Sequence, residues 1–350
     1  MTTPPLEAAA PRFAPRPKID PRWVRLLWPL LALVALLLFD FLFIENFFHV
    51  GLRDGHLYGS VVDILENAAP VMLLAIGMTL VIATGGVDLS VGSVMAVAAA
   101  AAAQVVAAGH SAALAFAAAL AAGLAAGAWN GALVALLGIQ PIVATLILMV
   151  AGRGIAHLVT NDQIITFTDP AYSFLGSGYF LRLPFSLTLV AVVLLATALL
   201  VRKTALGLFV EAVGGNASAS RYAGVNATAV KWMVYVFSGA CACVAGLISA
   251  ADINAADPAN NGLYLELDAI LAVVIGGTAL TGGRFSLPGS IIGALVIQAL
   301  TTTILTYGVA PEKSLVVRAA VVVLVCLLQS EGLRDKVAAL RRARAARRAG

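Results

Sequence analysis

Long apolar runs dominate this chain and restrict it to a membrane-spanning fold. Hydrophobic residues make up 61 % of its 350 positions and charged residues only 11 %, whereas a soluble globular protein carries about 25 % charged residues. A spanning helix needs about 20 apolar residues. We therefore predict an all-α membrane protein with about ten transmembrane helices, at residues 24–44, 60–83, 88–108, 112–137, 141–160, 186–201, 229–251, 267–281, 286–307 and 313–330. The short run at 267–281 is expected to be a broken or half helix.

A glycine-rich pattern interrupts two of these runs in the same way. In the first run, Thr84-Gly85-Gly86 is followed after five residues by Gly92-Ser93. In the second run, Thr281-Gly282-Gly283 is followed after five residues by Gly289-Ser290. Such breaks are typical of transporters built from two related halves, because unwound backbone in a bilayer needs protein or water around it. We predict two glycine-broken helices in an internal repeat; coincidence in a chain with 32 glycines is the alternative. Six predicted spans separate the breaks, which favours a parallel repeat, but one incomplete span would make it inverted.

Basic residues predict the orientation of the chain. Of 22 Lys and Arg residues, five lie in residues 12–25, four in 202–231 and seven in 334–348. Even numbers of predicted spans separate these segments, and Lys and Arg accumulate on the cytoplasmic side of membranes. Both termini are therefore expected in the cytoplasm, and the loops at 161–185 and 252–266 in the periplasm.

The same patterns predict three parts of the chain. Residues 1–22, rich in Pro and Ala, form a disordered cytoplasmic tail, and residues 23–330 form the transmembrane domain. Residues 331–350 form a basic cytoplasmic tail that is expected to lie on anionic lipid. The net charge of +4 comes from these clusters, so it indicates membrane lipid and not nucleic acid as a partner.

Several kinds of chemistry have no motif here. The dipeptide Gly-Lys never occurs, so the chain has no phosphate-binding loop of the common type. The histidines and cysteines have no ligand spacing, and neither a cofactor nor a metal site is expected. Energy for uphill transport must then come from an ion gradient or a partner chain. Asp88 is the clearest carboxylate within a span that an ion-coupled carrier could use.

The segment at 202–231 is the longest predicted cytoplasmic connection. Gly214-Gly215-Asn216 suits a tight turn because Gly and Asn tolerate positive φ. Residues 217–223 can form a short surface helix that Gly224 ends. Such a helix is either a docking site for a soluble partner or a plain solvated loop.

Polar residues within the spans have two interpretations each. Asp88, with Ser90, can cap the helix that restarts after the first break or contact a transported solute. Thr84 can satisfy backbone groups that the glycines free. Arg153, one turn from His157, can pair with a carboxylate or line a polar path, and Asn130 is a weaker candidate for the same lining.

Three stretches resemble the permeases of sugar ABC importers, the ribose, arabinose, xylose and galactose class. They are residues 74–93, 212–225 and 265–284. Where that family usually has Gly after Arg284, this chain has Phe285. With residues 140–154 and 260–263, Phe285 makes the chain most similar to galactofuranose permeases.

The resemblance implies a bacterial inner-membrane protein without bond-making chemistry. A second permease chain, identical or different, would complete the pathway, two ATPase chains would bind beneath it, and a periplasmic binding protein would deliver the sugar. The ATPase would push on a surface made of Gly207, Glu211, Gly214, Asn216, Arg221 and Gly224. The helix breaks and pathway would involve Thr84, Gly85, Gly86, Asp88, Ser90, Gly92, Arg153, Gly282 and Gly283. The alternatives are an ion-coupled secondary carrier and, from another class, a membrane-embedded enzyme.

Overall fold

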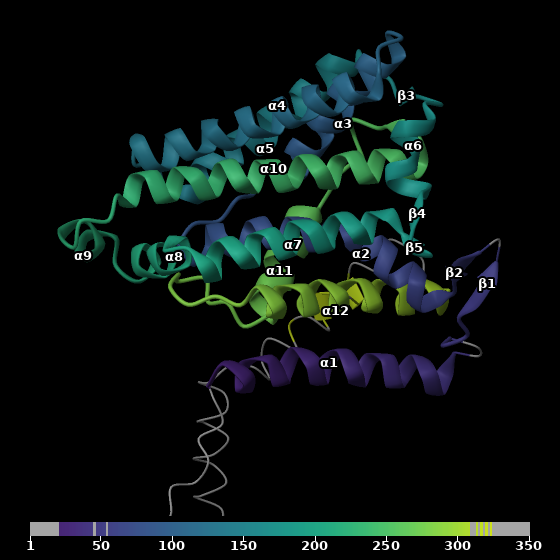
Figure 1. The fold of residues 1–350 in the computed structure, drawn as a ribbon, viewed down its shortest axis with the longest axis horizontal. Helices are drawn as coiled ribbons and strands as arrows, with labels where there is room; N and C mark the ends of the chain where they lie inside the picture. The colour runs from purple at the N-terminus through teal and green to yellow at the C-terminus, as the bar shows by residue number, and fades with distance from the viewer. Residues whose placement is uncertain are drawn as a thin grey trace, which may run out of the picture.

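The protein is an elongated bundle of helices (Figure 1). The computed structural model describes residues 21–44, 47–53 and 55–308, with isolated positions between 313 and 323. Within these, seven helices are long and apolar enough to cross a membrane: α1 (Pro21–Phe43), α2 (Ser60–Ala83), α4 (Ala112–Gly131, continued by the π-helical turn Ala132–Leu136), α5 (Pro141–Thr160), α7 (Phe185–Lys203), α10 (Ala227–Ile253) and α12 (Leu287–Thr306). The all-α membrane fold is confirmed. The total of ten spans is not, and the 313–330 run lies mainly outside the described residues.

Two shorter helices start within the bundle. They are α3 (Val91–Ala107) and α11 (Leu265–Ile275). At about 1.5 Å per residue the 11 residues of α11 span about 16 Å, roughly half of a bilayer core about 30 Å thick. The expectation of a half helix in this region is therefore confirmed.

The remaining elements lie at the two ends of the bundle (Figure 1). At one end, where α1 begins, are α8 (Leu206–Gly215) and α9 (Ala217–Tyr222). At the other end are α6 (Pro170–Ser177) and three antiparallel two-stranded sheets: β1 (Gly51–Arg53) with β2 (His56–Tyr58), β3 (Ile165–Thr166) with β6 (Ala255–Ala256), and β4 (Tyr179–Phe180) with β5 (Leu183–Pro184). The β3–β6 pair joins the two loops predicted to share the periplasmic side.

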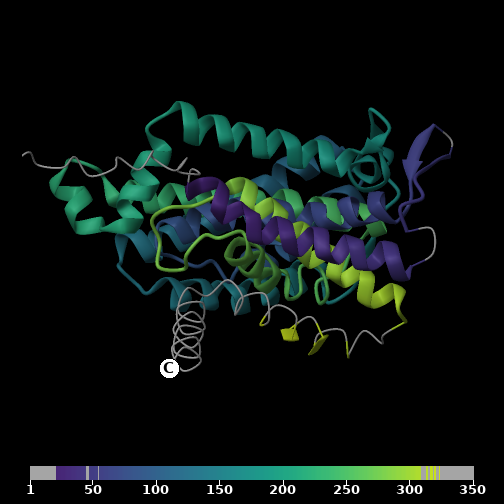
Figure 2. The same ribbon diagram turned by 90° about the horizontal axis from the view of Figure 1, so that it is seen from below.

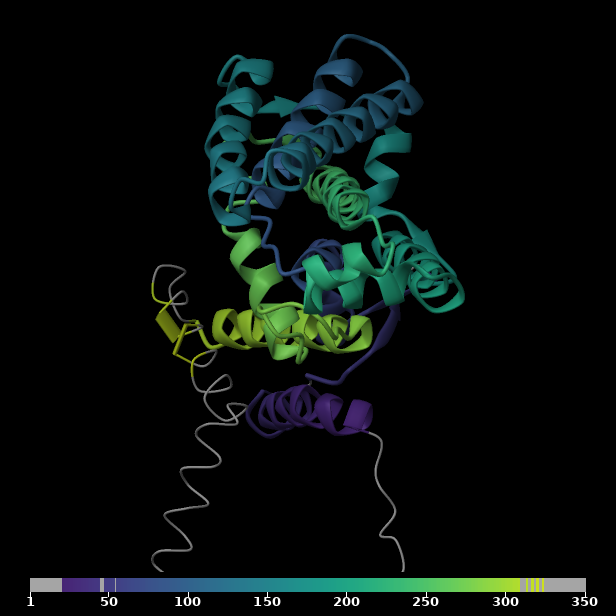
Figure 3. The same cartoon turned by 90° about the vertical axis from the view of Figure 1, so that its left-hand side faces the viewer.

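The core lies around α2 and α10. In their most apolar windows 78 % and 67 % of residues are buried, against 11 % in α1 and 17 % in α7. Small residues permit the close packing, since a Cβ at Gly127 of α4 would overlap the Tyr235 carbonyl of α10. Figure 3 shows α1 at the edge of the bundle, next to α12, and Figure 2 shows α1 in front of α12. The Thr303 hydroxyl of α12 donates to the buried Asp40 carboxylate of α1 at 2.8 Å.

Candidate functional site

The first glycine break is a regular helix end. Gly85 has a φ of 79°, its N–H donates to the Ile82 carbonyl at 2.8 Å, and the Gly86 N–H donates to the Val81 carbonyl at 3.1 Å. These two bonds satisfy carbonyls that the end of α2 would leave without partners. Thr84 adds a bond from its hydroxyl to the Val81 carbonyl at 2.8 Å. Gly85 adopts this positive φ without the strain that a Cβ would cause, so α2 can end just before it, at Ala83.

The second break is built differently from the sequence expectation. Helix α11 ends at Ile275, and Gly277, with a φ of 85°, turns the chain away from the helix. The Gly277 and Thr278 N–H groups donate to the Val274 and Val273 carbonyls. The repeated motif at Gly282-Gly283 therefore lies in the following loop and does not end the helix. The helix predicted at 267–281 therefore ends earlier, at Ile275, because Gly277 offers the chain an earlier left-handed stop.

The two breaks meet at one point together with α8. The Gly283 N–H donates to the Ala83 carbonyl at 2.8 Å, and a Cβ on Gly282 would lie 2.9 Å from the Gly85 nitrogen. A Cβ on Gly214 would overlap the Ala83 carbonyl oxygen and lie 2.6 Å from the Gly283 nitrogen. We call Ala83, Gly85, Gly214, Gly282 and Gly283 the glycine joint. Residues separated by about 200 positions are thus in backbone contact, and both breaks lie on the same side of the bundle.

The segment between α7 and α10 presents an exposed surface beside this joint. Helix α9 forms as predicted, and Gly224, with a φ of 85°, ends it. The predicted Gly-Gly-Asn turn is wrong: Gly214 and Gly215 complete α8, and Asn216 has a φ of −160°. Asn216 instead caps α9, where its side-chain oxygen accepts from the Ala219 N–H at 2.9 Å.

Exposure varies within this segment. Arg221 is exposed, and Tyr222 next to it is 95 % exposed. Glu211 is half-buried, and Gly207 is buried where a Cβ would overlap the Val201 carbonyl. The exposed face of α9 is therefore free of contacts with the described part of the chain, whereas α8 is packed against the joint.

Asp88 ties the restart of α3 to the core. Its Oδ1 accepts from the Ser90 N–H at 3.1 Å and the Ser90 hydroxyl at 2.6 Å. Asn130 of α4 donates to the same oxygen at 3.4 Å, and Ser238 of α10 donates to Oδ2 at 2.9 Å. Asp88 is 1 % exposed. These bonds favour the structural interpretation of Asp88, since protein donors occupy both carboxylate oxygens.

Gly86 and Gly92 are buried sites of close approach on either side of Asp88. A Cβ at Gly86 would lie 2.5 Å from the Tyr235 hydroxyl oxygen, and one at Gly92 would overlap the Gly262 carbonyl. Ser238 could not be identified from the sequence, because a serine in an apolar helix gives no signal of its partner.

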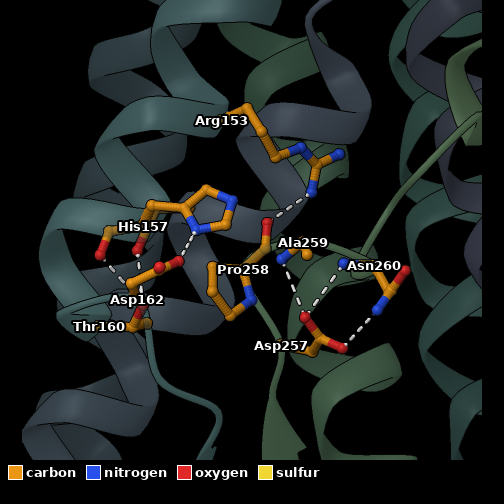
Figure 4. Close-up of polar contacts among 9 residues, drawn as sticks. Arg153, His157, Thr160, Asp162, Asp257, Pro258, Ala259 and Asn260 are labelled. Atoms are coloured by element: carbon orange, nitrogen blue, oxygen red, sulfur yellow. Dashed lines mark hydrogen bonds and ion pairs between the residues drawn. The ribbon is translucent and has the colours of Figure 1, made fainter.

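Arg153 of α5 lies apart from the glycine joint, against the loop between α10 and α11. Its Nη1 donates to the Pro258 carbonyl at 3.0 Å (Figure 4) and to the Asn261 carbonyl at 2.7 Å. His157 pairs with Asp162 at 2.6 Å, and both His157 and Arg153 lie close enough to Asp257 to interact with its charge. Burial would raise the pKa of Asp257, but hydrogen bonds from Asn260 and Ala259 and the nearby His157 hold that pKa below its usual value.

Comparison with known proteins finds relatives that cover most of this chain. The family described as branched-chain amino acid transport system / permease component matches residues 60–326. The galactofuranose transporter permease of Escherichia coli is 54 % identical over 90 % of this chain and 92 % of the relative. The fructose import permease of Bifidobacterium longum is 40 % identical over 91 % and 92 %, and the ribose import permease of E. coli 36 % over 86 % and 92 %.

No solved structure gives a significant match. The matched region nevertheless contains both glycine breaks, α8, α9 and the Arg153 contacts. The chain therefore belongs to the branched-chain amino acid transport system / permease component family.

Proposed function

We propose that this chain is the membrane-spanning permease subunit of an ATP-driven importer that moves a monosaccharide from periplasm to cytoplasm. Galactofuranose is the first candidate, because a permease named for it is 54 % identical over nine tenths of both chains. The fructose and ribose permeases support a sugar over the amino acids in the family description. ATP hydrolysis takes place on a partner chain, and this subunit has no bond-making role.

The contact of α8 with both helix breaks carries this proposal. Gly214 lies against Ala83 of the first break and Gly283 of the second. A displacement of α8 must therefore move the backbone of both breaks, because close-packed backbone cannot absorb it. An importer that is driven by a partner's nucleotide cycle needs such a path from its surface to its interior.

The partners follow from the two ends of the bundle. We infer that ATPase chains bind the α8–α9 end, where Arg202, Lys203 and Arg221 are exposed, and that this end and both termini lie in the cytoplasm of a bacterial inner membrane. Gly207, Glu211, Gly214, Asn216, Arg221 and Gly224 transmit the ATPase movement. The strand end receives a periplasmic sugar-binding protein, and a second permease chain completes the pathway.

Reconstitution in liposomes tests the function. The permease alone should show no ATP-driven uptake of labelled galactofuranose, because it has no nucleotide site of its own. Uptake should appear when the ATPase and the sugar-binding protein are added. Uptake by the lone chain that follows a proton or sodium gradient and collapses with an ionophore would overturn the proposal in favour of a secondary carrier.

Charge reversal tests the docking surface. Arg221→Glu should weaken ATPase binding, measured by co-purification, while membrane insertion stays normal, because the side chain is exposed and its loss leaves the fold intact. Arg182→Glu, at the opposite end and also exposed, is the control. Equal ATPase binding by both variants would remove Arg221 from the docking surface.

A further inference from the structure

The N-terminal ends of the two half helices meet inside the bundle. A Cβ at Gly92, in the first turn of α3, would overlap the Gly262 carbonyl and the Glu266 carboxylate. Gly262 lies three residues before the start of α11, and Glu266 lies in its first turn. Helix α3 runs from here toward the strand end, whereas α11 runs to the loop that reaches the glycine joint (Figure 1). Two partly positive helix ends thus converge about midway along the bundle.

Polar side chains lie at this meeting point, and one of them, Asn261, has no side-chain hydrogen bond within the described residues. Asn261 is 6 % exposed, and within the described residues neither its side-chain oxygen nor its nitrogen has a partner. A buried amide without partners is unfavourable, so a group from outside the described chain is a candidate partner for it. Glu266 is also 6 % exposed, and a buried carboxylate needs an opposite charge or hydrogen-bond donors near it.

Arg153 supplies the third group. Only Nη1 of its guanidinium has hydrogen-bond partners among the described residues, the Pro258 and Asn261 carbonyls. The Arg153 side chain is half-buried, and the negative charges of Glu266 and Asp257 act on it. A guanidinium, an amide and a carboxylate therefore lie near the meeting point of α3 and α11. The guanidinium and the amide have hydrogen-bonding groups without a partner among the described residues.

This set of groups matches the chemistry of a sugar. Adjacent hydroxyls on a sugar ring donate to a carboxylate or an amide oxygen and accept from a guanidinium or an amide N–H. The opposite charges of Arg153 and Glu266 suit a neutral polyol, which a site of one charge sign would not favour. Half-helix ends that converge midway through a membrane protein are also where transporters bind their solutes.

We propose that Arg153, Asn261 and Glu266 form a polyol-binding site through which the sugar passes, at the meeting point of α3 and α11. The proposal rests on the importer function and names the solute contacts of that function. In the state described here the Arg153 bonds to Pro258 and Asn261 hold the 257–261 loop against α5 and keep the Asn261 amide buried. The sugar binds when that loop separates from α5 and exposes the amide.

The test uses the complete importer in liposomes and measures galactofuranose uptake and ATP hydrolysis side by side. Asn261→Ala should reduce uptake about tenfold, the effect of one lost hydrogen bond to a passing solute. ATP hydrolysis stimulated by the binding protein should stay within about twofold of wild type, since the glycine joint is untouched. Arg153→Lys, which keeps the charge but loses the planar fork, should show the same separation of the two activities.

Asn260→Ala is the matched control. Asn260 is the exposed neighbour of Asn261 in the same loop, and it bonds to Asp257. Its loss should change uptake less than about twofold, because it removes an exposed contact within the loop and no group at the meeting point.

A thermal unfolding midpoint separates ligand contact from folding. Asn261→Ala removes an amide without partners, so it should leave the midpoint unchanged or raise it. Wild-type uptake by Asn261→Ala, or a lowered midpoint with both activities lost together, would overturn the binding site. Failure of the wild-type importer to take up any sugar would instead overturn the proposed function.

Discussion

The two glycine breaks share a motif but are held in different ways. The first break is bonded to three other helices: Ser238 of α10 and Asn130 of α4 donate to Asp88, and Thr145 of α5 donates to the Val87 carbonyl at 3.3 Å. In the second break, the described bonds are mostly internal. The Ser286 N–H donates to the Thr278 hydroxyl at 3.3 Å, which closes the loop on itself.

This difference predicts which of the two breaks follows a movement of α8. The second break reaches the rest of the protein through the Gly283 bond to Ala83 and through Phe285, which packs against the Val210 and Val213 cluster. Its Leu280 is 51 % exposed, and Arg284 is also exposed. We therefore expect the first break to act as a fixed part and the loop from Gly277 to Ser286 to be the part that moves with α8.

Removal of the Asp88 anchor should have the largest effect. Asp88→Ala leaves the Ser90 N–H and the buried Ser90 and Ser238 hydroxyls without their acceptor, and each such loss costs about 1–3 kcal/mol. We expect a loss of at least about 3 kcal/mol in stability, detected as a lower thermal unfolding midpoint in detergent.

The control for this prediction is Asp63→Ala, which removes an exposed carboxylate from the first turn of α2. Its effect should be within about 0.5 kcal/mol of zero, as for most surface substitutions. If both variants unfold at the same temperature, the first break is not fixed by Asp88, and the contrast between the two breaks disappears.

The sequence predicts the elements of this region better than their contacts. Apolar runs give the spans because each must be about one bilayer long, and Gly224 gives the end of α9 because few other residues accept its φ of 85°. The choice between Gly277 and Gly282 as the end of α11 could not be made, since both glycine pairs permit a left-handed stop.

The glycine joint itself leaves no trace in the sequence. Ala83, Gly214 and Gly283 meet through backbone atoms, so no complementary charge, size or hydrogen-bonding side chain marks them as neighbours. The unpartnered amide of Asn261 is equally invisible, because an Asn beside Asp257 and Gly262 is typical of any turn.

Gly214→Ala should have an intermediate effect, at the contact between α8 and both breaks. The new Cβ would overlap the Ala83 carbonyl, and such overpacking typically costs about 1–3 kcal/mol. Since the clash is with backbone, α8 must shift away, and ATP-driven uptake should fall more than ATPase binding does. Gly215→Ala is the control in the same helix, because nothing lies within 4 Å of its Cβ position; equal uptake by both variants would contradict transmission through the joint.

The smallest effect is expected at the restart of α12, where the second break depends on a single capping hydroxyl. The Ser286 Oγ accepts from the Gly289 N–H at 3.2 Å, so Ser286→Ala should cost about 1 kcal/mol, the usual value of an N-cap. Ser111 begins α4 without a side-chain cap bond, and Ser111→Ala should therefore change the unfolding midpoint very little. Because the loop before Ser286 is held mainly by its own bonds, loss of the cap should also raise hydrogen exchange in residues 277–289 while residues 84–93 keep their protection. Equal loss of protection in both segments would mean that the two breaks move as one unit.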